Sequence, residues 1–149
     1  MIEIEILIPF IDHEQTYQAA KVRLETIRKI ISTSGFYEIK KIKIHEINSI
    51  DLKEIVKVKI SNTSEQYVYE LLDVANKVFN TNEKIFFYYY TLRGFSSTEL
   101  QNGINEENVI INNVSRIKDS ILKKLKYSIQ NIIIYEKELI NQEDNYDWF

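Results

Sequence analysis

Residues 84–95 read KIFFYYYTLRGF, and five consecutive residues of this stretch, 86–90, are aromatic. Aromatic side chains favour strands, and both sets of alternating residues in the segment are apolar. The sequence therefore predicts a strand over residues 84–92 that is buried on both faces. No catalytic motif competes with this segment, so its surroundings decide how the rest of the chain is interpreted.

A strand with two apolar faces needs a cover on each of them, because a bare apolar edge strand promotes association. Helices earlier in the chain can cover one face. Three covers are open for the other face: the C-terminal helical stretch around residues 110–132, another protein, or a ligand that stacks on the aromatic rings. We favour the chain's own helix first, a protein interface second and stacking last.

The composition is that of one globular domain. The chain has 149 residues, of which 44% are hydrophobic and 28% are charged. Its 19 basic and 22 acidic residues give a net charge of −3, which provides no overall attraction to nucleic acid or to an anionic membrane. Cysteine is absent, which excludes disulfides, thiolate nucleophiles and cysteine–zinc sites.

The N-terminal segment MIEIEILIPF places isoleucine at every second position up to Pro9, a pattern typical of a strand. It carries acidic residues where an export signal needs basic ones. The apolar runs along the chain are too short for a transmembrane helix. We therefore expect a cytoplasmic protein that does not insert into a membrane.

Two helices are predicted in the first half of the chain, one over residues 13–33 and one over residues 63–78. In both, apolar residues recur at a spacing of three or four, which places them on one face of a helix. Gly35 follows the first helix and is a typical C-terminal stop.

Two further strands are predicted between these helices, one over residues 36–47 with a bulge near residues 40–41, and one around residues 56–60. Residues 1–92 then have the order βαββαβ. This order predicts an α+β fold of the ferredoxin-like type, in which two helices cover one face of an antiparallel sheet. The aromatic segment would be an edge strand of that sheet.

The remainder of the chain is divided into three segments of the same single domain. Residues 93–107 are predicted as a polar loop, and loops of this length are often functional. Residues 108–141 carry apolar residues at helical spacing and are predicted as a C-terminal helical extension. Whether this extension is one helix or breaks near Ser128 is left open. Residues 142–149, QEDNYDWF, form an acidic aromatic tail.

Motifs for catalysis, metals and cofactors are missing from the sequence. The two histidines, His13 and His45, fit neither a metal-binding motif nor a two-histidine catalytic motif. With three glycines in total, the chain has no glycine-rich phosphate-binding loop. We therefore expect no enzyme, no catalytic residue, no metal and no cofactor.

Direct RNA binding through the predicted sheet is disfavoured. RNA-recognition domains of this topology place stacking aromatic residues on the two central strands. The corresponding positions here carry Glu3 and Glu5 on the first strand and Lys57 and Lys59 on the third. Such a pattern is typical of a charge-paired sheet face.

The favoured function is a small interaction module that binds and regulates or neutralises another protein, as an immunity protein, an antitoxin or a phage-encoded inhibitor does. Self-association through the aromatic strand or the last helix is also open. The alternative is a regulatory domain of the ACT type, which shares the predicted topology and binds small molecules. An enzyme that uses Glu3 and Glu5 is the least favoured. The candidate interaction surface, chosen because aromatic and arginine side chains are common at interfaces, consists of Tyr88, Tyr90, Arg93, Phe95, Trp148 and Phe149.

Overall fold

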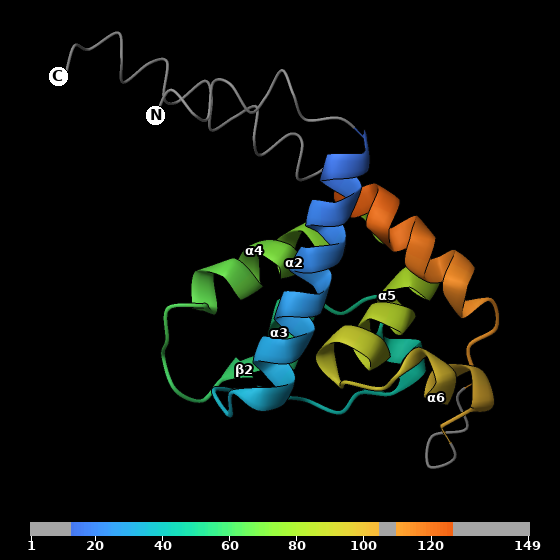
Figure 1. The fold of residues 1–149 in the computed structure, drawn as a ribbon. Coiled ribbons are helices and arrows are strands. Elements are labelled where there is room, and N and C mark those ends of the chain that lie inside the picture. Colours follow the sequence, from blue (N-terminus) through green and yellow to red (C-terminus); the bar gives the residue numbers. More distant parts are fainter. Residues whose placement is uncertain (1–12, 105–109, 127–149) are drawn as a thin grey trace, which may run out of the picture.

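The computed structural model describes residues 13–104 and 110–126, and within these ranges the protein is mostly helical (Figure 1). The α-helices are α2 (His13–Thr33), α3 (Leu52–Ile55), α4 (Glu65–Val78), α5 (Thr81–Phe87) and α6 (Ser97–Asn102), and residues 114–126 form a further helix. The other elements are strands β1 (Tyr37–Ile39) and β2 (Val56–Val58), the 3-10 helix η1 (Ile44–Glu46) and the π-helix η2 (Tyr88–Leu92).

The predicted ferredoxin-like sandwich is wrong. Within the described residues the sheet has two strands, β1 and β2, which pair antiparallel with Tyr37 opposite Val58. The predicted strand over residues 36–47 ends early at Ile39, and η1 follows it. The predicted strand over residues 84–92 is helical. The first predicted strand lies outside the described residues.

The two helices predicted from apolar spacing are confirmed. α2 covers the predicted range, and its Ala20, Leu24 and Ile27 side chains are completely buried. α4 begins at Glu65, close to the predicted start, and buries its apolar stripe in the same core. Gly35 has a φ of 71°, a conformation that glycine adopts without strain, and the chain turns there from α2 into β1.

The aromatic segment is helical because a helix start signal precedes it. The Asn80 side chain accepts a hydrogen bond from the Glu83 backbone N–H at 3.0 Å, and the Glu83 carboxylate accepts one from the Asn80 N–H at 2.8 Å. This capping box starts α5. The segment continues as a π-helix, in which the Arg93 N–H donates to the Tyr88 carbonyl at 2.9 Å. A helix that is apolar all round belongs in a protein interior, and the side chains of residues 86–90 are all 5% exposed or less.

The end of η2 is held by Arg28 of α2. Gly94, with a φ of 80°, turns the chain after the π-helix. The Arg28 guanidinium donates hydrogen bonds to three backbone carbonyls around this turn, those of Tyr90 at 3.0 Å, Gly94 at 3.2 Å and Phe95 at 3.3 Å. It also lies 4.4 Å from the centre of the Tyr90 ring. These contacts of Arg28 therefore hold α2 against the C-terminal end of the aromatic segment.

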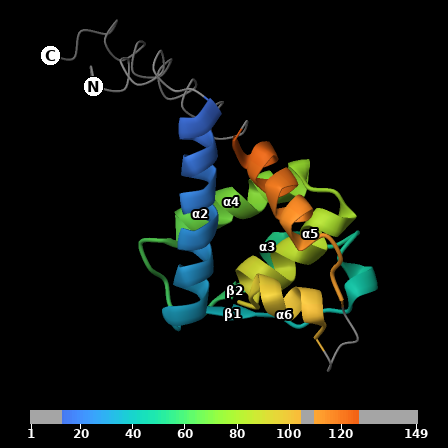
Figure 2. The same cartoon turned by 45° about the vertical axis from the view of Figure 1, so that its right-hand side comes forward.

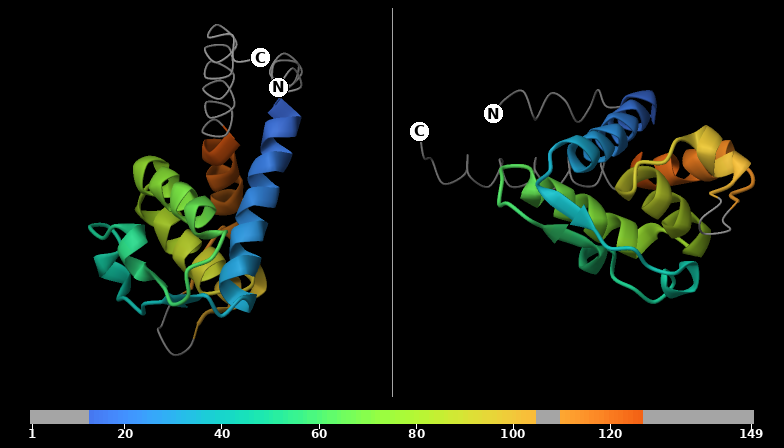
Figure 3. Two further views of the ribbon diagram at one scale, coloured as in Figure 1. Left: turned by 90° about the vertical axis from the view of Figure 1, so that its left-hand side faces the viewer. Right: turned by 90° about the horizontal axis from the view of Figure 1, so that it is seen from below.

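The chain itself covers the aromatic segment, but this segment is helical and is not the strand whose second face the sequence analysis assigned to residues 110–132. α2 crosses α4 (Figures 1 and 2) and packs against η2. The helix at residues 114–126 lies beside the N-terminal half of α2 (Figure 3), where the Tyr17 hydroxyl donates to the Asp119 carboxylate at 3.3 Å. The Tyr90 hydroxyl joins both helices, because it donates to Glu25 at 2.5 Å and accepts from Lys118 at 3.0 Å.

The predicted polar loop over residues 93–107 contains a short helix, α6. Its start is another capping box, in which the Ser96 side chain accepts from the Glu99 N–H and the Glu99 carboxylate accepts from the Ser96 N–H. Of the C-terminal extension predicted over residues 108–141, residues 114–126 are helical. Ser128 and the acidic aromatic tail lie outside the described residues.

Candidate interaction groove

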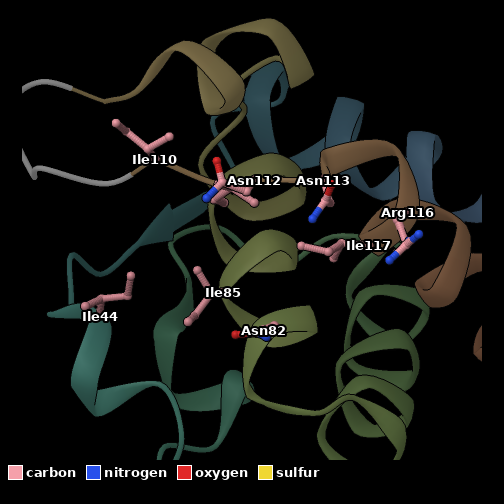
Figure 4. A pocket seen from close by; sticks show the side chains of 9 residues that line it. Ile44, Asn82, Ile85, Ile110, Asn112, Asn113, Arg116 and Ile117 are labelled. Atoms are coloured by element: carbon pink, nitrogen blue, oxygen red, sulfur yellow. The ribbon is translucent and has the colours of Figure 1, made fainter.

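Two adjacent hollows share the side chain of Ile44, and together we call them the Ile44 groove. The first has a volume of about 500 Å³ and is formed by η1, α5 and residues 110–117 (Figure 4). The second has a volume of about 530 Å³ and follows residues 41–46. The first is lined by Ile44, Asn82, Ile85, Ile110, Ile111, Asn112, Asn113, Arg116 and Ile117. The second is lined by Lys41, Ile42, Lys43, Ile44, His45, Glu46 and Tyr89.

Isoleucine side chains form the apolar part of the groove. Ile44 of η1 is 40% exposed and Ile110 is 63% exposed. Ile85 of α5 lines the same hollow as these two residues (Figure 4). Exposed isoleucines that gather at one hollow are a feature of surfaces that bind a partner, whereas scattered ones are ordinary.

The rim of the groove carries amides and positive charge. Asn82, Asn112 and Asn113 offer both hydrogen-bond donors and acceptors to a ligand in the first hollow. The exposed side chains of Lys41, Lys43 and Arg116 carry three positive charges, against the one carboxylate of Glu46. The groove therefore suits a ligand that combines apolar groups with negative charge.

Tyr88 fixes the segment that forms the second hollow. Its hydroxyl donates a hydrogen bond to the Lys40 carbonyl and accepts one from the Ile42 N–H, each at 3.1 Å. Tyr88 is completely buried, so these bonds tie the backbone at residues 40–42 to the core. The side chains of Lys41 and Lys43 project from a backbone that is held in this way.

Glu83 fixes the helix that forms the other side of the first hollow. Its side chain is 3% exposed and forms an ion pair with Lys124 at 2.5 Å, and it accepts a hydrogen bond from the Ser120 hydroxyl at 2.5 Å. Burial by itself would raise the pKa of the Glu83 carboxyl. The hydrogen bonds from Lys124, Ser120 and the Asn80 N–H outweigh burial and lower that pKa below its ordinary value of 4.5.

Lys118 supports the same helix from the side of α2. It donates to the Tyr90 hydroxyl and lies 3.5 Å from the Glu25 carboxylate. Burial would lower the pKa of the Lys118 ammonium, but the contacts with Tyr90 and Glu25 outweigh it and raise the pKa. Lys118 is therefore positively charged over the whole physiological range of pH.

Asn113 lies where the chain enters the helix at residues 114–126. Its φ is 58°, the left-handed region that asparagine tolerates better than other side-chain-bearing residues. Its carbonyl accepts the Ile117 N–H at 3.0 Å, which is the first hydrogen bond of the helix. Asn113 thus both starts this helix and lines the groove.

The structure separates the residues proposed as an interaction surface. Tyr88 and Tyr90 are in the interior, 0% and 5% exposed, where they position other segments. Arg93 and Phe95 are half-buried, and the Arg93 guanidinium lies 5.2 Å from the centre of the Phe95 ring. Trp148 and Phe149 lie outside the described residues, as do Glu3 and Glu5.

The two histidines lie on different elements. His45 is exposed on η1 and lines the second hollow, and His13 begins α2. Among the described residues, no three His, Asp or Glu side chains are grouped closely enough to hold a metal ion. In the same part of the chain, no helix is both long and apolar enough to cross a membrane.

The sequence analysis did not identify the groove. Two signals pointed to parts of it: the basic run Lys40-Lys41-Ile42-Lys43, and the pair Asn112-Asn113 before an apolar helical stretch. Neither signal shows that Ile44 and Ile110, far apart in the sequence, share one hollow.

The sequence matches no protein-family model, and comparisons with curated proteins and with solved structures give no match.

Proposed function

We propose that the protein is an interaction module that binds an acidic, apolar segment of another protein in the Ile44 groove and thereby regulates or neutralises it. The observation that carries this proposal is the composition of the groove, whose exposed Ile44 and Ile110 are accompanied by Lys41, Lys43 and Arg116. A binding role rather than a catalytic one, and a cytoplasmic location, are parts of the same proposal.

A peptide fits this groove better than a nucleic acid does. Single-stranded nucleic acids bind by stacking their bases on exposed aromatic rings. Among the described residues that line the two hollows, the aromatic residue is Tyr89, and it is 1% exposed. Apolar side chains of a peptide can instead pack on Ile44, Ile85 and Ile110, while Asn82 and Asn112 can pair with its backbone.

The ACT-type alternative loses its main support. It depended on the βαββαβ order, and the described residues form one two-stranded sheet with helices around it. The groove is also a surface feature with two exposed isoleucines, rather than an enclosed site of the kind that surrounds a small molecule.

Selection from a random-peptide library displayed on phage tests this function on the full chain. We expect enriched peptides to combine Asp or Glu with aromatic or branched apolar residues. Their affinity should fall at least about tenfold when Ile44→Asp or Arg116→Glu is introduced, because the first change removes an apolar contact and the second reverses a positive charge of the rim. Val22→Asp is the matched control, since Val22 is 62% exposed on α2.

Two results would overturn the proposal. One is enrichment of peptides whose binding is equally strong in the Ile44→Asp, Arg116→Glu and Val22→Asp variants. The other is retention of a labelled single-stranded oligonucleotide, with an affinity that falls steeply with salt and that depends on Lys41 and Arg116. That second result would assign the groove to nucleic acid.

A further inference from the structure

The charges of the chain are divided unevenly between the described residues and the remainder. Of the 19 lysine and arginine residues, only Lys137 lies outside the described ranges. Of the 22 acidic residues, ten lie outside them. The described part of the chain therefore has a net positive charge, although the whole chain is negative. These ten are Glu3, Glu5, Asp12, Glu106, Glu107, Glu136, Glu138, Glu143, Asp144 and Asp147.

The segment at residues 142–149 has the composition that the Ile44 groove suits. QEDNYDWF contains three carboxylates, three aromatic rings and no basic residue. The carboxylates of Glu143, Asp144 and Asp147 complement the positive charges of the rim. Tyrosine and tryptophan are also among the side chains that contribute most to binding energy at interfaces, and phenylalanine is enriched there as well.

The described helix at residues 114–126 leads away from the groove. Arg116, at the N-terminal end of this helix, lines the groove, while Lys126 ends the described helix roughly 15 Å further along at 1.5 Å per residue. A tail that returned to the groove of its own chain would have to reverse this direction. A second copy of the chain faces no such constraint.

We propose that the tail at residues 142–149 of one copy binds in the Ile44 groove of a second copy. This inference rests on the proposed function, because it assigns an occupant to the same groove. Two copies can exchange tails reciprocally, and the second contact is then favoured by its high effective concentration. An external partner with an acidic aromatic segment would compete with the tail, so self-association would control access to the groove.

Trp148 provides a direct test, because it is the one tryptophan of the chain. We expect its emission to shift to longer wavelength, and its quenching by acrylamide to increase, as the full chain is diluted. Both changes should follow the fall in molar mass from dimer to monomer measured by light scattering. Ile44→Asp and Ile110→Asp should move both transitions to at least about tenfold higher concentration, while Val22→Asp should leave them unchanged.

Mixing two variants separates exchange between copies from binding within one chain. In the Ile44→Asp variant Trp148 should be readily quenched, and the Trp148→Ser variant retains an intact groove. Adding the second variant to the first should protect Trp148 from acrylamide, since one intact groove and one intact tail are then present. Circular dichroism of each variant checks that the helical fold is retained.

Three outcomes would overturn the inference, and they are distinguishable from failure of the proposed function. Protection of Trp148 at every dilution, without an effect of mixing, would place the tail on its own chain. Protection of Trp148 that is as strong in the Ile44→Asp and Ile110→Asp variants would place the tail on another surface. Trp148 that is readily quenched at all concentrations would show that the tail is unbound. In that case, binding of a labelled QEDNYDWF peptide to the Trp148→Ser variant would still support the proposed function. Failure of this peptide to bind would count against both the inference and the proposed function.

Discussion

The Tyr88 hydroxyl oxygen lies 3.1 Å from the backbone nitrogen of Ile42, whose N–H donates a hydrogen bond to it. This contact links the aromatic core to the segment that carries the basic rim of the groove. In the proposed function Tyr88 therefore contributes without touching a ligand, because it fixes the backbone from which Lys41 and Lys43 extend.

Replacing Tyr88 by phenylalanine should destabilise the protein and weaken peptide binding together. The change leaves the Ile42 N–H and the Lys40 carbonyl without their buried partner, which costs about 1–3 kcal/mol of unfolding free energy. Urea denaturation measures the stability, and hydrogen exchange at residues 40–46 should accelerate. Tyr69→Phe, which changes a half-buried tyrosine of α4, is the matched control and should have a smaller effect on both stability and exchange. Unchanged exchange at residues 40–46 would contradict the positioning role.

Glu83→Gln should loosen the helix at residues 114–126. The substitution removes the charge that pairs with Lys124, and hydrogen bonds to a charged group contribute about 1.5–3 kcal/mol. Urea denaturation should show this loss, and the amides of residues 114–126 should exchange faster than those of α4. Glu99→Gln changes an exposed capping carboxylate and is the control. Equal losses of unfolding free energy in the two variants would contradict the proposed role of the Glu83 charge in holding this helix.

The same carboxyl predicts how stability depends on pH. Because the pKa of Glu83 is lower in the folded protein than its ordinary value of 4.5, the stabilisation is fully present above that value. It is lost as the pH falls through the lowered pKa. The unfolding free energy of the wild type should therefore decrease below about pH 4.5, and the Glu83→Gln variant should show a shallower decrease. Parallel pH profiles would be inconsistent with this assignment.

Arg28→Lys should destabilise the protein although the charge is retained. A lysine ammonium cannot reproduce the planar fork that donates to the carbonyls of Tyr90, Gly94 and Phe95. We expect a loss of about 1–3 kcal/mol in unfolding free energy, measured by urea denaturation. Lys29→Arg, on the next residue of α2, should have little effect. An equally large loss of unfolding free energy in Lys29→Arg would show that the hydrogen bonds of the Arg28 guanidinium are not the cause of the destabilisation.

The stability of Asn113 variants should depend on whether the new residue tolerates a positive φ, rather than on the size of its side chain. At a φ of 58°, valine is strained relative to glycine by about 1–2 kcal/mol. Asn113→Val should therefore be less stable than Asn113→Gly by this amount in thermal denaturation. Equal melting temperatures of the two variants would argue against the left-handed conformation.

The amphipathic helices could be predicted from the sequence, because one side of each faces the core and the other faces water. The apolar spacing of α2 and α4 follows directly from that arrangement. The aromatic segment could not be assigned in this way. Its residues are buried all round, and a continuous apolar run has no periodicity that separates a helix from a strand.

A local signal for the aromatic segment did exist in the sequence. Asn80 and Glu83 have the spacing of a capping box, which starts a helix at Thr81. The sequence analysis followed the strand preference of aromatic residues instead, and the predicted fold class failed with it. The groove itself depends on Ile44, Ile85 and Ile110 lining one hollow, and only the tertiary structure brings these residues together.

The most direct test of the Ile44 groove uses a fluorophore at its edge. The chain has no cysteine, so Ile110→Cys introduces a unique site for a bimane label whose emission tryptophan quenches on contact. The experiment uses the full chain with Trp148→Ser, and Val22→Cys is the labelled control. Titration with the peptide QEDNYDWF should quench bimane at residue 110 in a saturable manner and leave the label at residue 22 unchanged, and a peptide with lysine in place of its acidic residues should bind at least about tenfold more weakly. Equal, non-saturating quenching at both positions would contradict the assignment of the groove as the binding site.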